Sequence, residues 1–211
     1  MKVNRAVFIG GFGNGAASAE RVAEALTTYY DDADVFTFSK AMRKPDKVSK
    51  AVVGVDTFTH SAGMLALEHT YPTSITAFNA PLPTSKKHLI GKTLHKTARM
   101  HAPGVGIHSA EDVKSVALYD ASATGELILH TVGNLRHLGR IAEFDAIASA
   151  AAANSIGIST ELIYTDDDVY FQVPDHYRQL AERINVGLQM IPGEHDELAL
   201  RPDQTLHAVL G

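Results

Sequence analysis

The sequence contains no cysteine. Disulfide bonds, cysteine nucleophiles and thiolate zinc sites are therefore excluded. It also lacks any run of about 20 apolar residues, the length that a membrane span requires, and the apolar segment at residues 6–9 is far shorter than a signal-peptide core. From these absences we expect a cytoplasmic protein without a membrane span.

An excess of positive charge is lacking as well. The 211 residues carry 19 lysines and arginines against 24 acidic residues, for a formal net charge of −5. Lys86-Lys87, with Lys92 and Lys96 nearby, forms the one notable basic cluster, and such a run is typical of a solvated helix face. The charge balance therefore does not favour a nucleic-acid partner, and we expect a small-molecule substrate instead.

Short apolar segments alternate with segments of helical spacing along most of the chain. This alternation is typical of a parallel sheet covered by helices on both faces. The expected strands lie at residues 6–9, 34–38, 55–59, 74–78, 161–165 and 187–191. The sequence thus predicts a three-layer α/β/α fold with a mainly parallel six-stranded sheet.

Residues 84–157 interrupt this alternation, because they contain helical patterns but no convincing strand. Helices are expected at residues 127–138 and 141–153, and Ser109 to Asp112 resembles a capping box. Ligands of open α/β sheets bind at the carboxyl ends of the strands. We interpret residues 84–157 as a helical cap over that edge, inserted within a single domain that spans residues 1–211.

A candidate nucleophile follows the third expected strand. The segment Thr59-His60-Ser61-Ala62-Gly63 leads from that strand into a helix, where a sharp turn would present the Ser61 hydroxyl above the sheet. Gly63 is small, as the close approach of helix and backbone requires. Thr59 departs from the usual first glycine of G-x-S-x-G. The alternative is that Ser61 is a helix N-cap.

Candidate partners for this serine follow the last two strands. Asp166-Asp167-Asp168 comes at the end of the fifth strand, and His195 follows the sixth. A serine hydroxyl needs an adjacent base, which His195 can provide, and an aspartate fixes the histidine tautomer. The chain order Ser, Asp, His is that of α/β-hydrolases. We expect His60 to support the turn rather than to transfer protons.

The first strand ends in the glycine-rich segment 10–15, Gly-Gly-Phe-Gly-Asn-Gly. Its N–H groups, at a helix N-terminus, can bind developing negative charge. We expect the Phe12 N–H and the Ala62 N–H to form an oxyanion hole. The same segment matches a dinucleotide fingerprint. Lys40 and Arg43 after the second strand would then suit only the 2′-phosphate of NADP, and no tyrosine stands four residues before a lysine.

Taken together, these motifs resemble the α/β-hydrolase fold superfamily over nearly the whole chain. The resemblance implies a serine hydrolase of the esterase type that needs no cofactor or metal, with Ser61, His195 and Asp168 as its triad and Asp167 as the alternative acid. It implies an ester substrate, with a thioester or amide as less favoured choices. A non-catalytic protein of this architecture that binds a small molecule or partner, and an NADP-binding Rossmann-type protein, are the alternatives.

Overall fold

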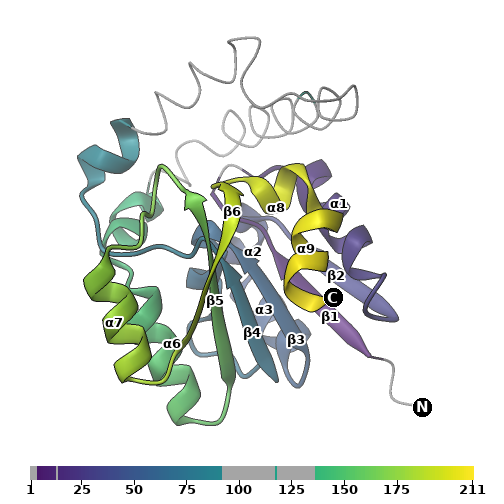
Figure 1. Ribbon diagram of the computed structural model, residues 1–211. Coiled ribbons are helices and arrows are strands. Elements are labelled where there is room, and N and C mark those ends of the chain that lie inside the picture. Colours follow the sequence, from purple (N-terminus) through teal and green to yellow (C-terminus); the bar gives the residue numbers. More distant parts are fainter. Residues whose placement is uncertain (1–3, 13, 92–116, 118–135) are drawn as a thin grey trace.

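A computed structural model describes residues 4–12, 14–91, 117 and 136–211 of the chain. Within these residues, six strands form one parallel sheet in the order β2-β1-β3-β4-β5-β6 (Figure 1). The strands are β1 Arg5–Ile9, β2 Asp32–Phe36, β3 Asp56–His60, β4 Ser74–Phe78, β5 Ser159–Asp167 and β6 Gly187–Glu194. The predicted α/β class and parallel six-stranded sheet are confirmed.

The strand order reverses direction beside β1. From β1 the chain passes through α1 (Ala16–Leu26) to β2 on one side, and from β2 it returns to β3 on the other side of β1. Because all six strands are parallel, the residues that follow β1, β3, β5 and β6 meet at one edge of the sheet. This is the place where open α/β sheets bind ligands.

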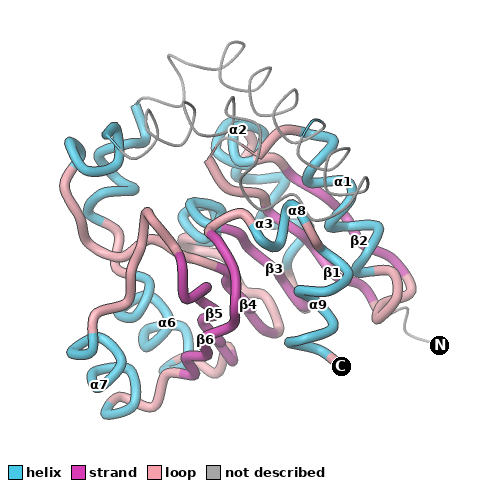
Figure 2. The backbone as a smooth tube through the Cα atoms, turned by 45° about the horizontal axis from the view of Figure 1, so that its top comes forward, coloured by secondary structure: helices cyan, strands magenta, loops and turns pink. Residues whose placement is uncertain are grey.

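Two helical layers cover the sheet. On one face, α1 packs with α8 (Glu197–Leu200) and α9 (Pro202–Leu210) against a core that includes Phe8, Phe58 and Ile163. The other face is covered by α2 (Phe38–Arg43), α3 (Pro45–Val52), α6 (Ala146–Ser155) and α7 (Asp175–Arg183). Figure 2 shows α6 and α7 on one side of the strands and α9 on the other. β1 is apolar at every position from Ala6 to Ile9 because both of its faces are buried.

Some boundaries differ from the sequence predictions. β2 ends at Phe36, two residues earlier than expected, because the Thr37 hydroxyl accepts a hydrogen bond from the Lys40 N–H and starts α2. The turn after β3 continues as a 3₁₀ helix, η1 (Ser61–Leu67), rather than an α-helix.

The helix expected at residues 141–153 is divided. Residues 136–143 are helical, and α6 starts afresh at Ala146, where Asp145 caps the N–H groups of Ile147 and Ala148 at 3.0 Å each. Most of the predicted cap, including the capping box at Ser109, lies outside the described residues. None of the described helices is long and apolar enough to cross a membrane.

Candidate active site

Ser61 occupies a strained turn at the end of β3. Its φ angle is +49°, in the left-handed region that residues other than glycine rarely adopt. Gly63 makes this turn possible, since a Cβ at that position would lie 2.4 Å from the Ile9 carbonyl oxygen. Backbone strain of this kind costs roughly 1–3 kcal/mol and clusters at functional sites. The sequence prediction of a sharp strand-to-helix turn at Ser61 therefore agrees with the backbone.

The glycine-rich turn after β1 lies directly against this serine. A Cβ added to Gly11 would be 2.6 Å from the Ser61 Cβ and 2.8 Å from the His60 carbonyl oxygen. Gly11 is therefore required for the close approach of the two turns. The glycines at the carboxyl end of β1 make room for Ser61 at the point where the strand order reverses.

His195 and Asp168 form a buried pair at the same edge of the sheet. The Nδ1 atom of His195 lies 2.8 Å from Asp168 Oδ2, and the two residues are 6% and 1% exposed. The N–H groups of Tyr170 and Phe171 donate to Asp168 Oδ1 at 2.7 and 3.0 Å. Burial alone would raise the pKa of Asp168, but His195 and these N–H donors outweigh burial and lower the pKa below its usual value.

The ionised Asp168 fixes the tautomer of its partner. Because a carboxylate only accepts hydrogen bonds, His195 Nδ1 donates the proton, and in the neutral ring Nε2 is left with a free lone pair. The His195 ring packs against Tyr170 and Phe171, with centroid separations of 4.7 and 5.6 Å. These contacts hold the imidazole in one orientation. Among the described residues, no hydrogen bond joins His195 to Ser61.

The other two aspartates of the run lie elsewhere. Asp166 accepts a hydrogen bond from the Gly193 N–H at 3.0 Å and is exposed. Asp167 is also exposed and ends β5 opposite Glu194. Of the three candidates, the structure brings only Asp168 to His195.

His60 joins the glycine-rich turn to the His195 loop. Its Nδ1 atom lies 2.7 Å from Asn14 Oδ1, and its Nε2 atom lies 2.8 Å from the His195 carbonyl oxygen. The Gly11 N–H also donates to Asn14 Oδ1, at 2.7 Å, which identifies that atom as the amide oxygen. Both nitrogens of His60 therefore face acceptors, and both must donate. An imidazole that donates from both nitrogens is an imidazolium.

An acidic residue and a second histidine lie close to His60. Nitrogen atoms of His60 and His195 and a carboxylate oxygen of Asp196 all lie within 4.8 Å of one another, and all three residues are buried. Such a group has the right donor types for a metal ion, but a metal-bound imidazole must supply a nitrogen lone pair. His60 has none to offer while both nitrogens donate. With this hydrogen bonding of His60, the three residues do not fit a metal site.

Two asparagines that sequence reasoning did not select complete this network. Asn14 links Gly11 to His60, as described above. Asn79, at the end of β4 with φ +48°, donates from Nδ2 to the His195 carbonyl oxygen at 2.7 Å and accepts from the Thr165 N–H at 2.8 Å. Asparagine tolerates the left-handed region that Asn79 adopts. The signals available in the sequence were the place of Asn79 directly after β4 and of Asn14 within the glycine-rich turn after β1.

The two predicted oxyanion donors belong to residues next in sequence to Gly11 and Ser61, which lie against each other. Phe12 lies in the turn that carries Gly11, and its ring packs edge-on against Phe38 with the centroids 6.1 Å apart. Within the described part of the chain, the Phe12 N–H donates no hydrogen bond. Ala62 is fully buried in the first turn of η1, where helical N–H groups have no partner within the helix.

Comparison with known proteins gives a consistent result for the fold. No family model matches the chain. No curated protein matches it either. A carboxylesterase structure from Nitrososphaera gargenis is similar with a TM-score of 0.64 and 13% identity, over 99% of this chain and 89% of that chain.

Two further solved structures are similar over most of both chains. The thioesterase domain from the curacin biosynthetic pathway has a TM-score of 0.59 and 12% identity, over 99% of this chain and 91% of its own. A thermophilic esterase from Thermogutta terrifontis has a TM-score of 0.62 and 11% identity, over 97% and 87%. The chain therefore has the α/β-hydrolase fold.

Proposed function

We propose that this chain is a serine hydrolase that cleaves esters, with Ser61 as nucleophile, His195 as general base and Asp168 as the acid that orients it. One observation carries the proposal. A serine with φ +49° ends β3 at the same sheet edge where a buried histidine donates to a buried carboxylate at 2.8 Å. The structural similarity to carboxylesterases and a thioesterase supports the same reaction class.

The residues would act in two steps. The Ser61 hydroxyl attacks the ester carbonyl carbon while His195 Nε2 takes its proton, and Asp168 stabilises the imidazolium that forms. The N–H groups of Phe12 and Ala62 would bind the oxyanion of the tetrahedral intermediate. His195 then returns the proton to the departing alcohol, and water hydrolyses the Ser61 acyl-enzyme by the same route.

The absence of a Ser61–His195 hydrogen bond among the described residues favours one second candidate, a non-catalytic protein that binds a small molecule. Catalytic hydrogen bonds are often long without substrate and tighten in the complex. The strained turn at Ser61 and the buried His195–Asp168 pair would have no role in a protein that only binds. We therefore place hydrolysis first.

Hydrolysis of p-nitrophenyl esters of increasing acyl length tests the proposal. Ser61→Ala should lower kcat by at least about 10³-fold, whereas Ser155→Ala, at an exposed serine of α6, should leave it unchanged. Both variants should show the wild-type circular dichroism spectrum. Turnover that survives in Ser61→Ala, or a wild-type protein that cleaves no ester, thioester or amide, would contradict the proposal.

A further inference from the structure

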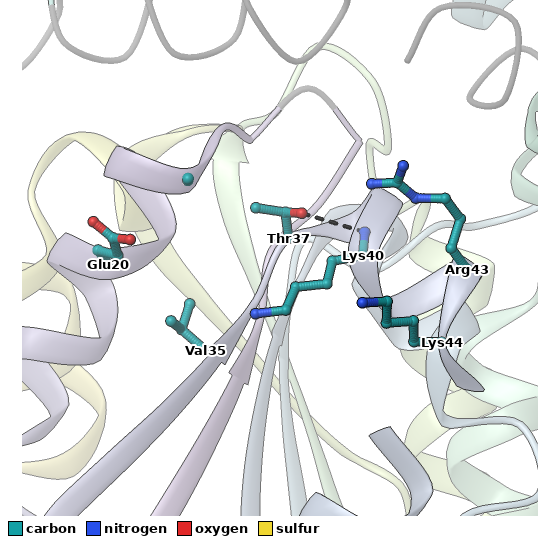
Figure 3. A pocket seen from close by; sticks show the side chains of 7 residues that line it. Glu20, Val35, Thr37, Lys40, Arg43 and Lys44 are labelled. Carbon is teal, nitrogen blue, oxygen red and sulfur yellow. Dashed lines mark hydrogen bonds between the residues drawn. The ribbon is translucent and has the colours of Figure 1, made fainter. Parts of the chain in front are cut away.

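A basic hollow lies at the β2 edge of the sheet, apart from the His195–Asp168 pair. It has a volume of about 430 Å³ and opens between α1 and α2 (Figure 3). Three cationic residues line it, Lys40, Arg43 and Lys44, against a single carboxylate, Glu20. Figure 3 shows Lys40 and Lys44 on the α2 side and Glu20 on the opposite wall. The lining side chains thus carry a net charge of +2.

Neither Lys40 nor Lys44 takes part in an ion pair within residues 4–12, 14–91 and 136–211. The Lys40 ammonium lies 5.3 Å from the centroid of the Phe36 ring. Arg43 donates a hydrogen bond from Nε to the Ser39 carbonyl oxygen at 3.0 Å.

Like charges that share a hollow repel one another, and a bound anion relieves that repulsion. A phosphomonoester carries about −1.5 to −2 charges at neutral pH, which matches the net charge of the lining. The hollow receives further positive potential from the start of α1, because Ala16 lines it and the first turn of that helix contains no acidic side chain. A carboxylate, with one negative charge, would leave one cation uncompensated.

The hollow is within reach of the candidate nucleophile. Gly11 lies against Ser61, and Ala16, five residues later, lines the hollow. Since consecutive Cα atoms are 3.80 Å apart, the Gly11 and Ala16 Cα atoms are separated by at most about 19 Å. A substrate of about this length would be long enough to place its reacting carbonyl at Ser61 and a terminal group in the hollow.

We propose that this hollow binds the terminal phosphate of the substrate, so that the protein acts on esters or thioesters with a phosphomonoester at their far end. The inference rests on the proposed hydrolase function. Lys40, Arg43 and Lys44 would form a specificity site at the sheet edge that also carries Ser61, the proposed nucleophile. The phosphate would not react, and its role would be to position the substrate.

A matched pair of substrates tests the proposal. The two are p-nitrophenyl esters of one ω-hydroxy fatty acid, with and without phosphate on the terminal hydroxyl. We expect the wild type to favour the phosphorylated ester in kcat/KM by on the order of tenfold, the combined effect of partly exposed ion pairs. The double variant Lys40→Gln/Lys44→Gln should lose this preference, so that kcat/KM becomes equal for the two esters. Lys50→Gln, which removes a charge from α3, should keep it.

A binding measurement separates failure of this inference from failure of the hydrolase proposal. Inorganic pyrophosphate, titrated by calorimetry, should bind the wild type and the Ser61→Ala variant, and bind the double lysine variant at least severalfold more weakly. Such binding in a protein that hydrolyses no ester would support the phosphate site while the hydrolase proposal fails. Equal hydrolysis of the two esters would overturn the inference. If pyrophosphate binds but the two esters are hydrolysed equally, the assignment of the substrate is overturned. The hollow would then bind a free phosphorylated ligand, and NADP is the compound to titrate next.

Discussion

The Nε2 atom of His60 lies 2.8 Å from the carbonyl oxygen of His195. His60, which precedes the candidate nucleophile Ser61, therefore contacts the loop that carries His195 directly. The opposite nitrogen of His60 holds Asn14 and, through it, Gly11. His60 thereby fixes the relative positions of the serine turn, the glycine-rich turn and the histidine loop. The network explains why a polar residue is completely buried at the end of β3.

Replacing His60 with alanine should therefore impair both stability and turnover. Two buried hydrogen bonds from a charged group are lost, each worth about 1.5–3 kcal/mol, so the free energy of unfolding should fall by about 3–6 kcal/mol in urea denaturation. kcat should fall more than KM rises. His88→Ala, at an exposed histidine, should change neither.

The protonation state of His60 can be observed directly. The ¹⁵N NMR spectrum near neutral pH should show both ring nitrogens of His60 protonated, since both face oxygen acceptors. A single neutral tautomer at this position would contradict the hydrogen-bond assignment. It would also require that the Asn14 amide be turned away from Gly11.

Asp168 should dominate the aspartate run in catalysis. Asp168→Asn leaves His195 in the wrong tautomer and should lower kcat by about 10⁴-fold, whereas Asp167→Asn, at an exposed position, should change it by less than about tenfold. Steady-state kinetics on a p-nitrophenyl ester measure both. A large effect of Asp167→Asn with a small effect of Asp168→Asn would show that the acid has been misassigned.

The lowered pKa of Asp168 also predicts a dependence of stability on pH. Its pKa is lower in the folded than in the unfolded protein, where it is about 3.9. The ionised carboxylate therefore contributes stability that is fully present above the unfolded value and is lost as the pH falls through the folded value. Urea denaturation should show an acid loss of stability below about pH 4 that is smaller in Asp168→Asn. An equal loss in both proteins would contradict the role of this pair.

Gly63→Ala should disturb the serine turn through the backbone of β1. The added Cβ would lie 2.4 Å from the Ile9 carbonyl oxygen and 3.0 Å from that of Gly10, so the strand and η1 must separate. We expect a loss of about 1–3 kcal/mol of stability, as for overpacking in a core, together with reduced turnover. Gly91→Ala, whose Cβ meets nothing within 4 Å, is the matched control and should be neutral or slightly stabilising.

Much of the fold could be predicted because the strands stand out from the helical segments in composition. The run from Ala6 to Ile9 is continuously apolar, since a parallel sheet buries both faces of its central strands. The strand from Ser74 to Phe78 is rich in the β-branched and aromatic residues that favour strands. The end of β2 could not be predicted from the sequence, because Thr37 and Phe38 continue a strand-like pattern. There a local hydrogen bond from the Lys40 N–H to Thr37 decides the structure.

The candidate site was predictable where position along the chain determines position in space. Ser61, Asp168 and His195 each follow a strand, and parallel strands bring such residues to one edge. Asn14 and Asn79 were not predicted as site residues, because their role depends on contacts with His60 and His195, residues distant in the sequence. The choice of Asp168 over its neighbours likewise depends on burial that no spacing reveals.

The most direct test of the central claim is active-site labelling. Wild-type protein treated with a fluorophosphonate near neutral pH should acquire one covalent adduct, which peptide mass spectrometry should locate on Ser61. Adduct formation should be lost in Ser61→Ala and strongly slowed in His195→Ala, while both variants remain folded. An adduct on another serine, an undiminished adduct in Ser61→Ala, or no adduct on the folded wild type would contradict the assignment of Ser61 as the nucleophile.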